Sequence, residues 1–417
     1  MGIVQPQLLL AVASEKVRRR LPSGTTNPLS RGPRGVTLVE LMLALAIAFI
    51  VIAAIYVLYQ TSVRGYRVQS QIVDMQTQLR FGIDHLKSDL RRAGHMATAN
   101  NRTDSSICWA PANVNLYAFS LERGEGFVAN AAQNINIFPS AITLFGDFFS
   151  PQGLGFDAVE ISGNVVQLAL SPTVVSMSQN EFETVFRPGI RWLRVENVDG
   201  VNYWYAAIDS VNYADRQITL QQSPGVGPCN PSAFGLRNIA PVGWIRYRLA
   251  EDTRTADLVG EVAQQQLFGK TDLIREEVDI SGDSVANTQL VIAEYAVDLQ
   301  FYDFGFDTAI AGSPAQITVL PLVSDVVSSD GATGFLSPLD EFATPERLRF
   351  LTVKLSVRSP VEEEELIFQT RQVGNSDAVS AEFAPIRTFE LNPDLVGAAR
   401  VESLAGRVSV LRTMWLR

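Results

Sequence analysis

The sequence is poor in the residues that build reactive sites. Its 417 residues include two histidines and two cysteines, and these four do not have the spacing of a zinc ligand set. It also lacks the glycine-rich phosphate loop and the Gly-X-Ser-X-Gly nucleophile motif. We therefore expect no enzyme activity, no metal and no other cofactor.

Positive charge is scarce beyond the first 35 residues. Those 35 residues carry a net charge of +5, whereas the remaining 382 carry −15. Because such an acidic surface repels phosphates, we expect no nucleic-acid partner. Basic residues ahead of a membrane span mark its cytoplasmic side, so the acidic part is expected outside the cytoplasm.

Charge is also missing from Leu41 to Val63, where Leu41–Tyr59 form a run of 19 apolar residues. At about 1.5 Å per residue the uncharged segment covers about 30 Å, the thickness of a bilayer core. An ordinary secretory signal has a shorter apolar region that ends at small residues, unlike this run. A plain signal anchor is an alternative that explains the span and its basic flank, but it gives no role to Glu40.

Proline is absent between Pro33 and Pro111, so a helix that begins at the span can continue beyond it. After Gln60, apolar residues recur every three or four positions, which predicts an amphipathic helix with one buried stripe. The stripe consists of Ile72, Met75, Leu79, Ile83, Leu86 and Leu90.

The predicted helix runs from about Val36 to Ala93. Two arginines followed by Gly94 form a typical C-terminal end signal. Gly65 and Gly82 are its weak points, since glycine costs up to about 1 kcal/mol relative to alanine within a helix.

The residues around the start of this helix read Arg34-Gly35-Val36-Thr37-Leu38-Val39-Glu40-Leu41. This segment closely resembles the processing site of type IV prepilins. The resemblance implies that a dedicated aspartyl peptidase cuts between Gly35 and Val36 on the cytoplasmic face, and that the new amine of Val36 is methylated. Glu40 then becomes the fifth mature residue, as in that family, while Val36 stands where phenylalanine is commonest.

The chemistry of this site agrees with the resemblance. A charged amine at Val36 in apolar surroundings is costly without a partner, and the carboxylate of Glu40 is four residues away on the same helix. In the family, this glutamate pairs with the amine of a neighbouring subunit and sets the axial register of the fibre. Small residues in the span allow helices to approach closely (Ala44, Ala46, Ala48, Ala53 and Ala54).

Beyond the helix the pattern changes to short runs typical of β-strands, several of which alternate apolar and polar residues. The runs are Ala158–Ile161, Val165–Leu170, Gln217–Leu220, Trp244–Leu249, Val297–Tyr302 and Leu348–Val357. We predict an α+β protein in which a long pilin-like N-terminal helix packs on a large antiparallel β-rich head.

The expected organisation is a cytoplasmic leader (1–35), a transmembrane part of the helix (36–60), its amphipathic part (61–94) and an exported head (95–417). A division of the head near residue 250 stays open. Cys108 and Cys229 fall in the head, where thiols can oxidise. They are either two buried thiols or a disulfide, which would close a loop of about 120 residues and contribute about 4–5 kcal/mol.

A narrower resemblance, to PilW-like minor pilins, involves four segments of the exported part. They are Leu86–His95, Ala293–Phe301, Val353–Ser359 and Arg407–Thr413. The resemblance implies a minor pilin of the kind that helps to initiate or cap pilus assembly, with links to twitching motility and cell adhesion. J-type pseudopilins of type II secretion systems share much of this pattern, and a signal-anchored envelope enzyme or binding protein is the alternative of another class.

The prepilin interpretation also implies partners and a location. The partners are the prepilin peptidase, other major and minor pilins and the inner-membrane assembly platform. We expect a single inner-membrane span with the N-terminus in the cytoplasm and the head in the periplasm, followed by transfer to the pilus surface.

Overall fold

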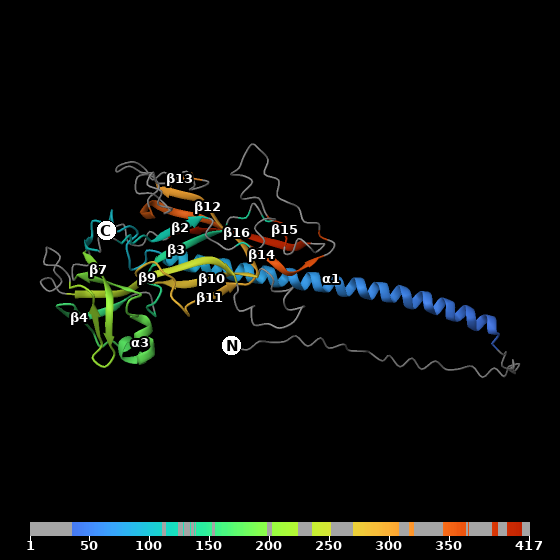
Figure 1. Cartoon of the computed structure of the whole chain (residues 1–417), viewed down its shortest axis with the longest axis horizontal. Helices are drawn as coiled ribbons and strands as arrows, with labels where there is room; N and C mark the ends of the chain where they lie inside the picture. The colour runs from blue at the N-terminus through green and yellow to red at the C-terminus, as the bar shows by residue number, and fades with distance from the viewer. Residues whose placement is uncertain are drawn as a thin grey trace, which may run out of the picture. The chain divides into compact units, whose positions relative to one another are not determined.

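A computed structural model describes residues 36–110, 114–123, 128, 134, 137, 139–151, 155–197, 202–223, 236–251, 270–307, 317–320, 345–363, 366, 386–390 and 398–410. The chain divides into two compact units, Met1–Gly65 and Tyr66–Arg417. Figure 1 shows the whole chain with its main helices and strands labelled. The leader 1–35 lies outside the described residues.

Helix α1, Leu38–Arg92, is the predicted N-terminal helix. Acidic Glu40 lies in its first turn and basic Arg91 and Arg92 in its last turn, which suits the helix dipole at both ends. Gly94 follows with φ of +75°, a conformation that favours glycine, and its N–H donates to the carbonyl of Phe145 at 2.8 Å. The predicted end signal is therefore confirmed.

In the second unit, α1 buries one face. Its buried residues are Met75, Leu79, Gly82, Ile83, Leu86, Asp89 and Leu90, and Ile72 is partly buried. The predicted apolar stripe is thus confirmed, with two additions that are not large apolar residues, Gly82 and Asp89.

Sixteen strands occur among the described residues. They are β1 Ile107–Trp109, β2 Phe119–Arg123, β3 Ser140–Gly146, β4 Phe156–Ser162, β5 Val165–Leu168, β6 Trp192–Asn197, β7 Tyr203–Asn212, β8 Gln217–Leu220, β9 Leu236–Glu251, β10 Thr271–Val278, β11 Leu290–Ala293, β12 Ala296–Asp307, β13 Ile317–Leu320, β14 Leu348–Glu363, β15 Thr388–Phe389 and β16 Ala398–Ser409. Each of the six runs expected to be strands falls on one of them, although β5 ends two residues earlier than its run.

The strands form two sheets. The larger follows the path β1-β7-β8-β5-β4-β9-β10-β11, with β2, β3 and β6 attached to it, and the smaller has the order β13-β12-β14-β16-β15. The described pairs are antiparallel apart from β1 with β7. The predicted α+β class with an antiparallel β-rich head is therefore confirmed.

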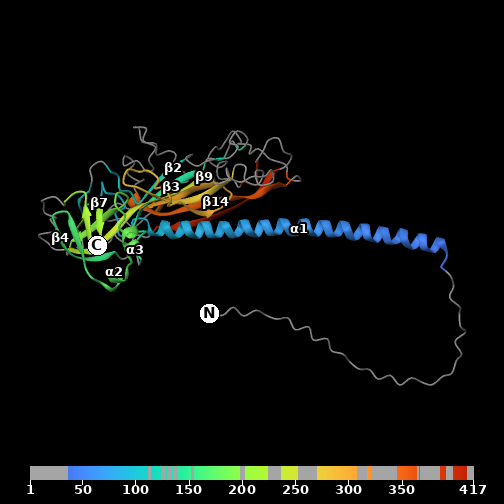
Figure 2. The ribbon, with the colours of Figure 1, turned by 60° about the horizontal axis from the view of Figure 1, so that its bottom comes forward.

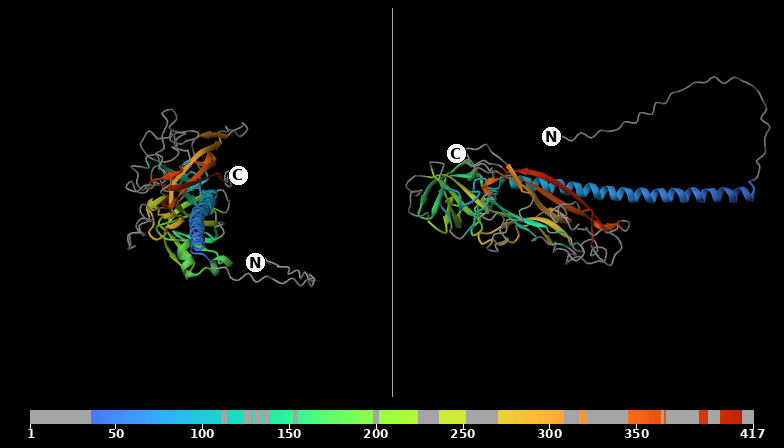
Figure 3. Two further views of the ribbon diagram at one scale, coloured as in Figure 1. Left: turned by 90° about the vertical axis from the view of Figure 1, so that its right-hand side faces the viewer. Right: turned by 90° about the horizontal axis from the view of Figure 1, so that it is seen from above.

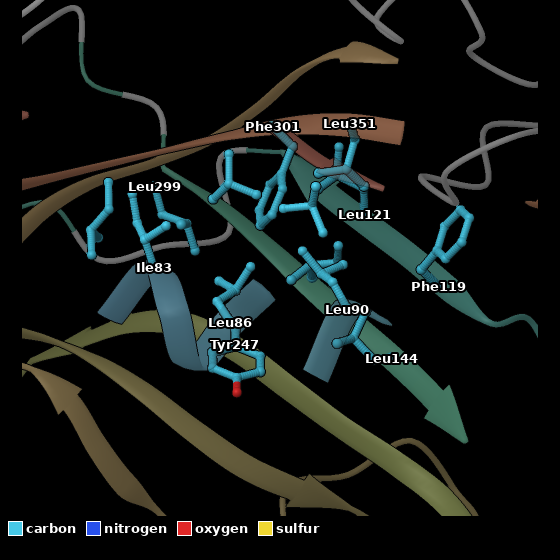
Figure 4. Packing of buried hydrophobic residues seen from close by; sticks show 14 of the residues in the cluster. Ile83, Leu86, Leu90, Phe119, Leu121, Leu144, Tyr247, Leu299, Phe301 and Leu351 are labelled. Carbon is cyan, nitrogen blue, oxygen red and sulfur yellow. The ribbon is translucent and has the colours of Figure 1, made fainter. Parts of the chain in front are cut away.

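The second part of α1 packs into the main core, between the smaller sheet and the β2-β3-β9-β10 region of the larger one. Figure 4 shows Leu86 of α1 beside Tyr247 of β9, and Leu90 near Leu144 of β3. Leu299 and Phe301 of β12 close the core from the smaller sheet. In the views of Figure 3, β14 and β16 run alongside this part of the helix.

A second core fills a distal lobe made of β4 to β8, the first part of β9 and the short helices α2 (Pro172–Ser176) and α3 (Gln179–Val185). Figure 2 shows this lobe beyond the C-terminal end of α1. Helix α3 begins with a capping box in which Ser178 and Glu181 bond each other's backbone N–H. The sequence analysis predicts neither helix, since each has fewer residues than the pattern needs to become visible.

Strand β9 belongs to both cores. Its residues 236–242 pair with β6 of the distal lobe, and residues 244–251 pair with β10 of the main core. Gly243 lies at the changeover, where an added Cβ would stand 3.1 Å from the Phe149 ring. The expected division of the head near residue 250 stays a prediction, because residues 252–269 lie outside the described part.

Candidate functional site

The start of α1 is organised by two side chains, Thr37 and Glu40. The backbone N–H of Thr37 donates to Oε2 of Glu40 at 3.0 Å, and the backbone N–H of Glu40 donates to Oγ1 of Thr37 at 3.2 Å. The hydroxyl of Thr37 also donates to Oε2 of Glu40, at 3.1 Å. This reciprocal pattern is a capping box, which satisfies backbone donors that the first helical turn leaves without intrahelical partners.

The capping box explains why the helix begins at Leu38, two residues after the predicted start at Val36. The T-x-x-E pattern of Thr37 and Glu40 is visible in the sequence, but the sequence analysis assigned Glu40 only to the pairing of an amine. In the described structure both interactions from Thr37 use Oε2 of Glu40. The carboxylate can therefore cap its own helix and still present Oε1 to a cation.

The residues that follow Glu40 are apolar and exposed. Helix α1 is long and apolar enough to cross a membrane, and none of its most apolar window is buried in the chain. Exposed fractions of 73 % for Val36, Leu38 and Val39 show that the segment has no protein cover here. A surface of this kind is stable in lipid or against other apolar helices, which is consistent with a membrane anchor.

The predicted cleavage site is only partly described. Val36 precedes the helix and is exposed, whereas Gly35 lies outside the described residues. The cut between them and the methylation of Val36 therefore stay predictions. Cys108, in β1, is disulfide-bonded. Cys229, the partner in the disulfide that the sequence leaves open, lies outside the described residues.

The other end of α1 is fastened to the head through Asp89, a buried carboxylate. Its Oδ2 accepts from Nε of Arg275 at 2.8 Å and from the hydroxyl of Tyr247 at 2.6 Å. Burial raises the pKa of Tyr247 well above its usual range, so its hydroxyl stays protonated and able to donate. His85 completes the group, with Nδ1 2.8 Å from the Tyr247 hydroxyl.

A second attachment lies at the last turn, where Nη2 of Arg92 donates to the carbonyl of Asp147 at 2.7 Å. Asp89 and Arg92 both belong to the segment Leu86–His95 on which the PilW resemblance depends. A solvated helix end would also explain these residues from sequence alone. In the structure, both join α1 to the head.

Comparison with models of protein families finds a match at the start of α1. Residues 30–56 match the family model described as the prokaryotic N-terminal methylation motif. No curated protein and no solved structure matches the chain. The matched residues include Gly35, Val36 and Glu40 and most of the apolar run. This motif, at the start of a helix of membrane-spanning length, indicates a type IV pilin-like or pseudopilin-like protein.

Proposed function

We propose that the protein is a minor subunit of a type IV pilus, held in the inner membrane by α1 until it enters the fibre. A prepilin peptidase cuts between Gly35 and Val36, and the amine of Val36 is methylated. The subunit then helps to initiate or cap assembly with other major and minor pilins at the inner-membrane platform. The head takes no part in catalysis.

The observation that carries this proposal is the methylation motif at the start of an exposed apolar helix. In a lone anchor Glu40 would serve only its own helix, whereas a neighbouring amine would also give its charge an ion-pair partner. A low copy number is expected from size, because a large head with several hydrophobic cores is hard to repeat along a thin fibre. The PilW-like segments support the same assignment.

The proposal is tested by mass spectrometry of the N-terminal peptide from protein extracted from membranes. We expect a mature chain that begins at methylated Val36. A functional protein that retains residues 1–35 would contradict the proposal and would favour a signal-anchored envelope protein.

The pseudopilin alternative involves the same helix in another apparatus, so it needs a separate test. Deletion of the gene should abolish pili and twitching motility if the subunit belongs to a pilus. Loss of enzyme secretion with intact pili would instead assign it to a type II secretion system.

A further inference from the structure

The distal lobe has a cavity of about 410 Å³ beside its two short helices, α2 and α3 (Figure 2). Its wall is formed by residues of these helices and, from the segment after β3, by Pro151. The volume falls within the roughly 300–1,000 Å³ that is typical of small-molecule sites in proteins. The lining residues lie between Pro151 and Val185, so the cavity is separate from α1 and from the methylation motif.

The two sides of the cavity are joined behind its wall by a buried residue, Arg191. Its Nη1 donates to the carbonyl oxygen of Val185 at 2.6 Å and to that of Thr184, at the C-terminal end of α3. Its guanidinium stacks 3.5 Å from the ring centre of Phe149, two residues before Pro151. These contacts fix the shape of the cavity, so a ligand that enters it orders few side chains and binds at a lower entropic cost.

The wall combines apolar side chains with polar ones that have hydrogen-bonding capacity left. Met177 and Val185 supply the apolar part and are buried, with only 6 % and 8 % of their surface exposed. Asn180 and Thr184 are four residues apart and therefore lie on one face of α3. Within the part of the chain that the structure describes, their two side chains make no hydrogen bond. They are therefore available to a ligand.

The charge of the lining limits the kind of ligand. Among the described residues, Glu181 is the one charged side chain that lines the cavity. Hydrogen bonds from Ser178 hold the pKa of Glu181 below its usual range, so it is ionised at neutral pH. Both bonds use Oε2, which leaves Oε1 for a ligand. A carboxylate without a basic neighbour repels anions, whereas a hydroxyl group can donate to it and can also pair with an amide.

We propose that this cavity binds a neutral saccharide unit, whose C–H face lies on Met177 and Val185. The hydroxyl groups of the sugar bond to Asn180, Thr184 and Oε1 of Glu181. A hexose fits this lining because its edge carries groups that both donate and accept, while its ring faces carry C–H bonds. The partner is then a glycan or polysaccharide that presents an uncharged sugar. Binding there is independent of how α1 enters a fibre, so it can be tested apart from the proposed function.

The test measures the binding of uncharged sugars to the full chain in a detergent whose headgroup is not a sugar. Saturation-transfer NMR is recorded with glucose, galactose, mannose and N-acetylglucosamine, and the dissociation constant is determined by titration. We expect at least one of them to bind, and the double variant Asn180→Ala/Thr184→Val to bind it about tenfold more weakly, because two hydrogen bonds are lost. Gln179→Ala is the matched control, since Gln179 is on the same helix but donates to Glu183. It should bind as the wild type does.

Protease resistance of the head in membrane-extracted protein shows that each variant is folded. If none of the four sugars binds, or if the double variant binds as tightly as the wild type, the saccharide inference is wrong. Neither result changes the N-terminal peptide, so the proposed function is judged separately.

Two charged probes test the role of the lining charge. We expect neither spermidine, a cationic amine, nor N-acetylneuraminic acid, an anionic sugar, to compete with the bound neutral sugar. Spermidine binding that Glu181→Gln abolishes would assign the cavity to cationic ligands and overturn the inference, because glutamine keeps the capping box but removes the charge. Preferential binding of the anionic sugar would overturn it as well.

Discussion

Arg191 carries a full charge in a place where only 1 % of its surface meets solvent. Its Nη2 donates to both carboxylate oxygens of Glu277 at 3.1 Å, and its Nη1 donates to the carbonyls of Val185, at 2.6 Å, and Thr184. The guanidinium also stacks 3.5 Å from the ring centre of Phe149. Burial lowers the pKa of Arg191 to about 10, which leaves it charged at neutral pH.

Replacing Arg191 with alanine should therefore destabilise the protein strongly. We expect the free energy of unfolding to fall by about 3–5 kcal/mol, because Glu277 and two carbonyls lose their partner together. Urea unfolding of the detergent-solubilised chain measures the change. Arg187→Ala is the control, since Arg187 is more exposed and lies 3.8 Å from Glu277, so its loss should cost about 0–1 kcal/mol. An equal loss of unfolding free energy in the two variants would show that the buried contacts of Arg191 stabilise the protein no more than the exposed Arg187 does.

Glu40 has two functions to separate, the capping of its own helix and the pairing of a neighbour's amine. Glutamine can replace glutamate in a capping box but carries no charge. We therefore expect Glu40→Gln and Glu40→Ala to be cleaved normally and to enter fibres about tenfold less than the wild type, as the loss of about 1.4 kcal/mol would produce. Quantification of sheared fibres against the membrane pool measures this. Normal assembly of Glu40→Gln would show that capping, not charge, is what Glu40 supplies.

At the scale of the element, the two glycines of α1 have different surroundings although the sequence analysis treats them alike. An added Cβ at Gly82 would lie 2.8 Å from Cδ2 of the buried Leu355 and 3.5 Å from Cβ of Ala293. At Gly65 it would meet nothing within 4 Å. Gly82 thus allows the close approach of α1 to the sheet, whereas no described residue lies within 4 Å of a Cβ added at Gly65.

Alanine substitution should accordingly act in opposite directions at the two positions. Overpacking at Gly82→Ala should cost about 1–3 kcal/mol, and the gain in helix propensity is only about 1 kcal/mol. We therefore expect a net fall in the free energy of unfolding. Gly65→Ala should gain that propensity without a clash. Thermal unfolding of both variants in detergent tests the pair, and a stabilised Gly82→Ala protein would mean that the core yields easily to the extra methyl group.

The attachment of α1 to β9 and β10 should depend on pH through His85. Burial lowers the pKa of His85 below its usual 6.5; nearby Asp89 opposes the shift and Arg275 favours it. A lowered pKa means that the unfolded chain binds this proton more tightly. The contribution of His85 to stability is therefore complete above about pH 6.5 and is lost as the pH falls toward the lower folded pKa.

We therefore expect the stability of the head to fall below about pH 6.5, and His85→Gln to weaken this dependence. Unfolding midpoints across pH 5–8, on the wild type and the variant, measure the effect. An identical profile for the two proteins would assign the pH dependence to other groups.

At the scale of the whole molecule, the disulfide at Cys108 ties β1, at the edge of the larger sheet, to another part of the chain. If Cys229 is the partner, as the sequence analysis allows, reduction should lower the free energy of unfolding by about 4–5 kcal/mol. Peptide mapping without reductant should recover Cys108 and Cys229 in one linked pair. Alkylation of Cys108 in unreduced protein would contradict this prediction.

The N-terminal helix was largely predictable, because its signals are local. The methylation motif depends on consecutive residues, and the apolar run, the stripe from Ile72 to Leu90 and the end at Gly94 depend on period and composition. The six predicted strands appear for the same reason. Helices α2 and α3 did not emerge from the pattern, since five and seven residues are too few to display a helical period.

Sequence by itself determined that this chain has an anchoring helix with a methylation motif and an acidic, β-rich head, since hydropathy, charge and spacing are properties of neighbouring residues. Tertiary structure alone decided that β9 joins two cores, that Asp89 is a buried tie to Arg275 and Tyr247, and that Gly82 is required by Leu355. In the sequence, Asp89 lies more than 150 positions from both Tyr247 and Arg275, and Gly82 lies more than 250 positions from Leu355. Contacts over such separations are set by packing, which no local pattern records.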